Sequence, residues 1–409
     1  MRIFFSVGEP SGDLHGANLI RALRKRHADC EFVGYGGPKM AIAGCELHAD
    51  LTQLAVMWVA QALVHLRKFL RLVAEADQYF RDVRPDLVVL IDYPGFNWWI
   101  ARKAKAQGIP VVYYGTPQLW AWASWRVKKM RRLVDHVLCK LPFEEAWFRQ
   151  RGCHATFVGH PYFDELEARR LDGLFVQRQA DTAGPLVTIL PGSRTQEVKS
   201  NLPALLKAAA LIRRRAPDVR FAVAAYKESQ RGLVNQTVAR GDLPVEVHVG
   251  RTAELIHTAR CCLACSGSVS LELLYHTRPS VILYQVSRLG FFVQRLFRKV
   301  RYITLVNLLS AEDPFAERAA GIYDPEDPRD RHVLMPEYLT CGDRSAELAE
   351  HVVSWLTDDA KHAAVERSLA ELKQRVAQGG ASERAAEYIT DLLEQSPDVS
   401  RRRLQRRSA

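Results

Sequence analysis

Short apolar runs of strand length alternate with longer amphipathic stretches through the first part of the chain. Helical periodicity is clearest at residues 66–83 and 142–150. The apolar runs lie at residues 2–7, 32–35, 87–91, 111–114, 136–138 and 156–158. Continuous apolar runs that alternate with helices are typical of a parallel sheet, whose strands are buried on both faces. The pattern therefore predicts a doubly wound α/β domain.

The same pattern starts again near the middle of the chain. Helical periodicity continues from residue 346 to about residue 394. The apolar runs of this second series lie at residues 187–190, 220–224, 245–249, 262–265 and 280–284. Residues 310–331 are rich in charge and proline, so we expect a surface excursion there. A second α/β domain is predicted.

These patterns divide the chain into four parts. Residues 1–165 and 186–380 are predicted to be two Rossmann-like domains that face a cleft. Residues 166–185 are polar and end in a Gly-Pro turn, which indicates a linker. The remaining part, 381–409, is expected to be a helix that returns across the junction and a basic tail.

Polar residues follow two of the apolar runs in the first half. Glu9, Ser11 and Gly12 lie in the turn after residues 2–7, and Asp92 follows residues 87–91 directly. Open α/β sheets bind ligands at the carboxyl ends of their strands. An Asp at that edge could accept a proton from a substrate hydroxyl, or it could form an Asx turn that binds local N–H groups.

Two small-residue turns precede helices in the second half. Gly192, Ser193 and Arg194 could surround a phosphate with backbone N–H groups and a guanidinium. A plain capping box is the alternative, because Ser193 and Gln196 have the spacing S-x-x-Q. The other turn consists of Ser266, Gly267 and Ser268, with Glu272 one turn inside the helix, and it could bind a second phosphate and a ribose.

Composition narrows the possible partners. The chain has 57 basic and 46 acidic residues in 409, a net charge of +11, which favours nucleic acid, phosphorylated metabolites or an acidic lipid surface. No apolar run approaches the roughly 20 residues of a membrane-spanning helix, so we expect a cytoplasmic protein. The eight cysteines lack disulfide spacing, and Cys262 and Cys265 are expected to be buried strand residues rather than metal ligands.

Metal and cofactor sites are not expected. No Asp-x-Asp occurs in the sequence, so the usual device for holding a metal-bound nucleoside diphosphate is missing. Helix N-termini and arginine would have to neutralise a diphosphate instead.

Nine sequence blocks together are highly specific. They cover the chain from residue 1 to about residue 340. The blocks are GEPSGDLHGANLIRAL (8–23), FVGYGGPKMAIAGCE (32–46), LAVMWVAQAL (54–63), VVLIDYPGFN (88–97), TPQLWAW (116–122), FVGHP (157–161), LPGSRTQEV (190–198), SGSVSLE (266–272) and LVNLL (305–309). In order and spacing the chain resembles the lipid-A-disaccharide synthases.

The resemblance implies a B-type glycosyltransferase fold and an inverting reaction. UDP-2,3-diacylglucosamine and 2,3-diacylglucosamine 1-phosphate would be joined through a β-1,6 linkage with release of UDP. It implies that Asp92 and Glu9 are catalytic. Substrate-binding residues are expected at Ser11, Gly12, Asn97, His160, Gly192, Ser193, Arg194, Glu197, Ser266, Gly267, Ser268, Glu272 and Asn307. Gly95 departs from the family pattern, since many members carry an acid there.

Other interpretations remain open on the sequence alone. Another UDP-sugar transferase or a UDP-N-acetylglucosamine epimerase would keep the same fold. A basic membrane- or nucleic-acid-binding protein would explain the charge but not the ordered glycine turns. With the family's substrates, we expect no nucleic acid partner, a possible homodimer, and a peripheral location on the inner membrane of a Gram-negative-type bacterium.

Two stretches have a composition suited to a membrane surface. Residues 54–72 join an apolar half to Arg67, Lys68 and Arg71. In residues 290–302, apolar side chains are interleaved with basic ones. Apolar side chains could enter the headgroup boundary while the cations meet anionic lipid. Ordinary core-facing helices are the alternative for both.

Overall fold

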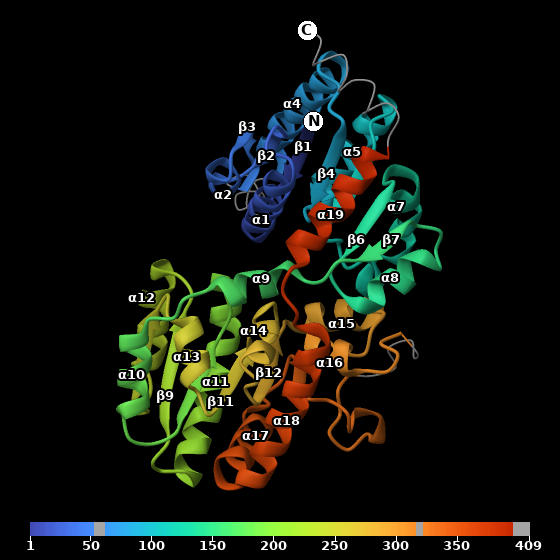
Figure 1. Ribbon diagram of the computed structural model, residues 1–409. Helices are drawn as coiled ribbons and strands as arrows, with labels where there is room; N and C mark the ends of the chain where they lie inside the picture. Colours follow the sequence, from blue (N-terminus) through green and yellow to red (C-terminus); the bar gives the residue numbers. More distant parts are fainter. Residues whose placement is uncertain (53–61, 316–321, 396–409) are drawn as a thin grey trace. The chain divides into compact units, whose positions relative to one another are not determined.

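The computed structural model describes residues 1–52, 62–315 and 322–395. The chain divides into two compact units (Figure 1). Unit 1 consists of Met1–Asp164 and Gln378–Ala409, and unit 2 is Glu165–Ala377. Residues 166–185, expected as a linker, include a helix of unit 2.

Unit 1 contains a seven-stranded parallel sheet, as the alternating pattern predicts. Its spatial order is β3-β2-β1-β4-β5-β6-β7. The strands are β1 (Arg2–Val7), β2 (Glu31–Gly36), β3 (Cys45–Asp50), β4 (Leu87–Ile91), β5 (Val111–Tyr114), β6 (His136–Cys139) and β7 (Ala155–Phe157). The strand order reverses between β1 and β4, so these neighbours form the topological switch point, where such sheets bind ligands.

Helices connect the strands of unit 1. They are α1 (Pro10–Arg26), α2 (Pro38–Ile42), α4 (Ala62–Asp82), α5 (Pro94–Ala106), α6 (Leu119–Trp122), α7 (Val127–Leu133), α8 (Pro142–Arg149), α9 (Pro161–Ala168), which runs into unit 2, and α19 (Ala381–Glu394), with a short 3-10 helix η1 (Ser124–Arg126). Five of them, α1, α2, α5, α8 and α9, begin with proline, whose fixed φ suits the first turn of a helix and whose missing N–H costs nothing there.

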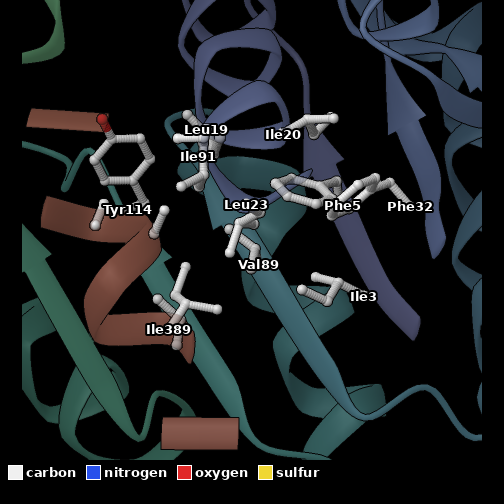
Figure 2. Packing of buried hydrophobic residues seen from close by; sticks show 14 of the residues in the cluster. Ile3, Phe5, Leu19, Ile20, Leu23, Phe32, Val89, Ile91, Tyr114 and Ile389 are labelled. Atoms are coloured by element: carbon white, nitrogen blue, oxygen red, sulfur yellow. The ribbon is translucent and has the colours of Figure 1, made fainter. Parts of the chain in front are cut away.

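The C-terminal helix α19 completes the core of unit 1. It packs against α1 (Figure 1). Figure 2 shows Ile389 of α19 beside the strand residues Val89 and Tyr114, in the same cluster as Phe5 and Leu23. All five side chains are almost completely buried. The residues that follow the second domain in sequence therefore stabilise the sheet that carries the first switch point.

Unit 2 contains a six-stranded parallel sheet of order β10-β9-β8-β11-β12-β13. Its switch point lies between β8 and β11. The strands are β8 (Leu186–Leu190), β9 (Arg220–Ala225), β10 (Val245–Val249), β11 (Cys261–Cys265), β12 (Ser280–Gln285) and β13 (Glu337–Thr340). Cys262 and Cys265 are buried free thiols on β11, which confirms that they are strand residues.

Helices lie before β8, between the strands of unit 2 and after β13. They are α10 (Gly173–Asp181), α11 (Thr195–Arg215), α12 (Glu228–Val238), α13 (Thr252–Thr258), α14 (Val269–Tyr275), α15 (Arg288–Phe297), α16 (Leu305–Ser310), η2 (Pro328–Asp330), α17 (Ser345–Thr357) and α18 (Asp359–Val376). The expected excursion 310–331 lies partly outside the described residues. Its described end is anchored, because buried Asp330 binds Arg301 at 2.6 Å.

Candidate functional site

The two polar turns predicted in the first half lie next to each other at the switch point of unit 1. Val7 at the end of β1 pairs with Ile91 at the end of β4. A Cβ atom built on Gly12 would lie 3.7 Å from Asp92 Oδ2 and only 2.9 Å from Val7, so the close packing requires glycine there. Glu9 and Ser11 are exposed at the start of α1.

The backbone at Asp92 is strained. Asp92 and Tyr93 have φ values of +46° and +42°, in the left-handed region that residues other than glycine rarely adopt. Such conformations cost on the order of 1–3 kcal/mol each and persist where surrounding contacts impose them. Strain of this kind is common at functional sites.

Buried side chains hold this strained turn. Asn97 Nδ2 donates to the carbonyl oxygens of Asp92, at 2.8 Å, and of Ser6 and Ile91, each at 3.2 Å. The Tyr113 hydroxyl donates to the Asp92 carbonyl at 2.5 Å. Asn97 is fully buried. Its amide is used to fix the turn, and contact of Asn97 with substrate stays a prediction.

Lys140, which sequence reasoning missed, pairs with the Asp92 side chain. Lys140 Nζ lies 3.1 Å from Asp92 Oδ1. The carboxylate thus binds an ammonium rather than the local N–H groups of an Asx turn. Burial lowers the pKa of Lys140, but the charges of Asp92 and Glu144 outweigh it and leave the pKa raised. Gly95, beside this turn, faces open space.

Two neutral histidines lie close to the pair. His160 follows β7, and its ring centroid lies 6.4 Å from that of His15 on α1. Burial lowers the pKa of His15 to about 4 and that of His160 well below its ordinary value. His15 Nδ1 is buried and has no hydrogen-bond partner among the residues that the structure describes. Both rings are uncharged at neutral pH, so Lys140 supplies the positive charge beside Asp92.

The two small-residue turns of the second half also meet, at the switch point of unit 2. Leu190 at the end of β8 pairs with Ala264 of β11. Gly192 has φ +126°, and a Cβ atom there would lie 2.6 Å from Glu197 Cβ. Gly267 has nothing within 4 Å of its Cβ position, so a ligand could approach its backbone. Ser268 begins α14 at this open turn.

A carboxylate already occupies part of the expected phosphate site. Glu197 Oε2 accepts hydrogen bonds from the N–H groups of Ser193 at 3.0 Å and Arg194 at 3.1 Å. A capping box thus forms between Arg194 and Glu197, not between Ser193 and Gln196. A phosphate that bound these two N–H groups would have to displace the Glu197 carboxylate. The Arg194 side chain is 80% exposed and can reach one.

Two more side chains, both missed from sequence, fix this loop. Asn201 on α11 donates to the carbonyls of Pro191, at 3.4 Å, and Glu197, at 2.9 Å, and accepts from the Gln285 N–H at 2.8 Å. Gln230 donates to the Ser193 carbonyl at 2.8 Å. Asn201 lies inside α11 and Gln230 on α12, so neither carries a local sequence signal that links it to the loop. Only the fold places them beneath it.

The remaining predicted ligands differ in accessibility. Ser266 Oγ lies 3.4 Å from the Ile303 carbonyl, and buried Glu272 binds Arg169 at 2.5 Å. Asn307 is fully buried and donates to the Met335 carbonyl at 2.7 Å and to Glu337 at 2.9 Å. Its amide fixes the segment before β13, and contact of Asn307 with substrate stays a prediction.

Within residues 1–52, 62–315 and 322–395, His, Cys, Asp and Glu side chains form no group of three that could hold a metal ion. Over the same ranges, no helix combines the length and the apolar character needed to cross a bilayer.

Solved structures of low identity share this fold. A putative UDP-N-acetylglucosamine 2-epimerase from Listeria monocytogenes superimposes with a TM-score of 0.64 at 11% identity, over 97% of each chain. The calicheamicin glycosyltransferase CalG4 matches with a TM-score of 0.57 at 17% identity, over 96% of this chain and 98% of that one. The fold is therefore that of the two-domain glycosyltransferases and nucleotide-sugar epimerases, as predicted.

Sequence relatives define the family within this class. The family model of lipid-A-disaccharide synthetase matches residues 3–337. The lipid-A-disaccharide synthase of Myxococcus xanthus is 32% identical over 96% of this chain and 97% of its own length. That of Trichlorobacter lovleyi is 32% identical over 97% and 98%. The chain belongs to the lipid-A-disaccharide synthetase family, which confirms the resemblance.

Proposed function

We propose that this protein joins two acylated glucosamine units. UDP-2,3-diacylglucosamine is the donor, 2,3-diacylglucosamine 1-phosphate is the acceptor, and the products are the β-1,6-linked disaccharide 1-phosphate and UDP. Full-length relatives named lipid-A-disaccharide synthase support this reaction. The observation that carries the proposal is the strained Asp92, a paired carboxylate at the switch point of unit 1 in a chain of this family.

Asp92 acts as the general base in this proposal. Its carboxylate accepts the proton of the acceptor 6-hydroxyl as that oxygen forms a bond to the anomeric carbon of the donor. The bond from this carbon to the diphosphate breaks, UDP leaves with the electron pair, and the configuration inverts. Glu9 and Ser11, exposed in the neighbouring turn, are placed to contact the acceptor.

The UDP group binds in unit 2. The exposed Arg194 guanidinium contacts the diphosphate, and the open backbone at Gly267 and Ser268 approaches it at the start of α14. Charge that builds on the leaving group is stabilised by these fixed donors. Glu272, held by Arg169, is suited to accept hydrogen bonds from ribose hydroxyls.

The direct test is an assay of the purified protein with both acylated sugars. The expected products are the disaccharide 1-phosphate and UDP in equal amounts. Either sugar alone, or UDP-N-acetylglucosamine in place of the donor, should give neither. Conversion of UDP-N-acetylglucosamine to an epimer without any acceptor would contradict the proposal.

The acylated substrates require contact with a membrane surface, and α15 is suited to it. The helix has no buried residue. Five large apolar side chains on it are between 44% and 73% exposed, namely Leu289, Phe292, Val293, Leu296 and Phe297. An amphipathic helix of this kind lies in the headgroup boundary with cations toward anionic lipid. We propose that α15 docks on the inner membrane peripherally.

The basic residues around α15 divide into two groups. Arg288, Arg295 and Lys299 are exposed and can face lipid phosphates. Arg298 is 7% exposed, and Arg301 binds Asp327 and Asp330, so neither is available for lipid. This corrects the expectation for residues 290–302. Of the other stretch, 54–72, residues 53–61 lie outside the described residues, while Leu66 and Leu70 on α4 are exposed.

Vesicle co-sedimentation tests the α15 proposal. The wild type should bind anionic vesicles, and binding should weaken as salt is raised. The double variant Phe292→Ser with Leu296→Ser should bind at least about tenfold more weakly, since two apolar side chains of about 1.5–3 kcal/mol each are removed. Leu174→Ser, at an exposed leucine on α10, is the matched control. Equal binding by all three proteins would contradict docking by α15.

A further inference from the structure

Lys140 reaches Asp92 across an intervening strand. It follows β6, whereas Asp92 follows β4, and β5 lies between these strands. At the end of β5, a Cβ atom on Gly115 would lie 3.6 Å from Asp92 Oδ1 and 3.7 Å from Lys140 Nζ. Gly115 thus lies directly beside the ion pair, and its φ of +73° is in the region that favours glycine.

The backbone of Lys140 is fixed as well as its ammonium group. Glu144 on α8 accepts hydrogen bonds from the N–H groups of Lys140 and Leu141, each at 3.0 Å. The side chains of Lys140 and Asp92 are only 16% and 18% exposed. Over the described parts of the chain, Lys140 is the one side chain that donates a hydrogen bond to this carboxylate. Asp92 Oδ2 is directed toward the turn at Gly12.

We infer that Lys140 is a positioning residue for Asp92: its ammonium group holds Oδ1 so that Oδ2 can face the acceptor hydroxyl. The inference rests on the proposed role of Asp92 as the base. A partly buried ion pair contributes little net stability, because desolvation offsets the attraction. Its value here lies in orientation: a carboxylate held at one oxygen presents the other in a defined direction.

Other titratable groups surround the pair. They are Glu9 in the turn after β1, His15 on α1, Tyr113 on β5, Glu144 on α8, His160 after β7 and Asp164 on α9. Burial lowers the pKa of both histidines and raises that of Tyr113. Among these neighbours, Asp92 is the group that the Lys140 ammonium contacts at 3.1 Å.

The experiment measures kcat, KM for the acceptor and the pH dependence of kcat in three variants of the full chain. Lys140→Met should lower kcat at least about tenfold and move the acidic limb of the profile up by about one pH unit, since a facing cation favours the carboxylate. Lys140→Gln keeps a donor without charge, so it should show the same movement with a smaller loss of kcat. Lys140→Arg keeps the charge, so its acidic limb should stay near that of the wild type.

Lys105→Met is the matched control. Lys105 binds Asp135 at 2.6 Å in the same unit. Asp135 also accepts a hydrogen bond from the Val111 N–H at the start of β5, so this ion pair lies at the amino-terminal ends of the strands, away from Asp92. This variant should leave kcat and its pH profile unchanged.

Two results would overturn the inference. One is an acidic limb at the wild-type position in both Lys140→Met and Lys140→Gln. The other is a raised KM for the acceptor with an unchanged profile, which would make Lys140 a ligand of the acceptor phosphate. Thermal unfolding shows whether each variant folds, and if Lys140→Met does not, the other two decide. Full activity of Asp92→Asn would instead refute the proposed base, whatever Lys140 does.

Discussion

Each unit fixes its switch-point loop with a buried asparagine, yet the two loops present opposite charges. Asn97 on α5 ties together the ends of β1 and β4, and Asn201 on α11 ties the loop after β8 to β12. Both side chains are at most 1% exposed. The loop held by Asn97 carries the carboxylate of Asp92. The loop held by Asn201 carries the exposed guanidinium of Arg194.

The two charged side chains also differ in how firmly their contacts hold them. Asp92 is paired with Lys140 and lies in a strained turn, whereas Arg194 contacts only Glu197, at 3.4 Å, over the described residues. A proton acceptor needs one fixed direction, because proton transfer depends on geometry within a few tenths of an ångström. A diphosphate carries charge on several oxygens, so a long flexible cation can meet it. The same scaffold thus supports a rigid base and an adaptable anion ligand.

The largest effect is expected in unit 1, at Asp92. Asp92→Asn keeps the size of the side chain but cannot accept the proton, so kcat should fall by about 10²–10⁴. UDP affinity and the thermal unfolding temperature should stay close to those of the wild type. Turnover assays and calorimetric titration with UDP measure these quantities. A near-normal kcat would remove Asp92 as the base.

The two asparagines test the comparison directly. Asn97→Ala and Asn201→Ala each leave several buried polar groups without partners, so each should lower the free energy of unfolding by about 3 kcal/mol. Asn97→Ala should also lower kcat without changing UDP affinity, and Asn201→Ala should do the reverse. Asn235→Ala, at an exposed position on α12, is the control. If both variants impaired the same property, the division of labour between the units would be wrong.

The sequence predicted the switch points but not what supports them. Continuous apolar runs identified β1, β4, β8 and β11, and glycine turns marked the loops after them. Strand β3, with polar residues at alternate positions at the sheet edge, was not recognised. Neither was Lys140, because its contact with Asp92 joins residues 48 apart through the parallel topology.

Residue type alone also does not show how some side chains are used. An asparagine near a loop can contact a ligand or the backbone, and only burial distinguishes the two. The side-chain amides of Asn97 and Asn307 donate hydrogen bonds to backbone carbonyls. Glu197 was likewise expected to contact substrate, yet its carboxylate caps α11.

A pH effect on stability is expected from the buried His15 of unit 1. Burial lowers the pKa of His15 to about 4, whereas the unfolded chain has a histidine pKa of about 6.5. Between these values the unfolded state binds more protons, so stability falls as the pH falls and is regained above pH 6.5 or so. From pH 7.5 to 5, His15 should account for a loss of about 2 kcal/mol.

Urea unfolding at both pH values measures this loss. It should be smaller by that amount in His15→Gln. In His154→Gln, at an exposed position of the same unit, the loss should equal that of the wild type. An unchanged pH dependence in His15→Gln would show that His15 is not held neutral.

The smallest effect is expected in unit 2, at Arg194. Arg194→Ala removes an exposed cation that makes one or two charge-assisted hydrogen bonds with the diphosphate, so UDP affinity should fall about tenfold. Turnover should fall with it, because the same charge stabilises the leaving group. Arg194→Lys should recover part of both, since a flexible ammonium can reach the same oxygens without the bidentate geometry. Arg231→Ala, on exposed α12, is the control. If Arg194→Ala bound UDP as the wild type does, the capped loop would be purely structural, and the anion site of unit 2 would have to lie at the open turn of Gly267 and Ser268.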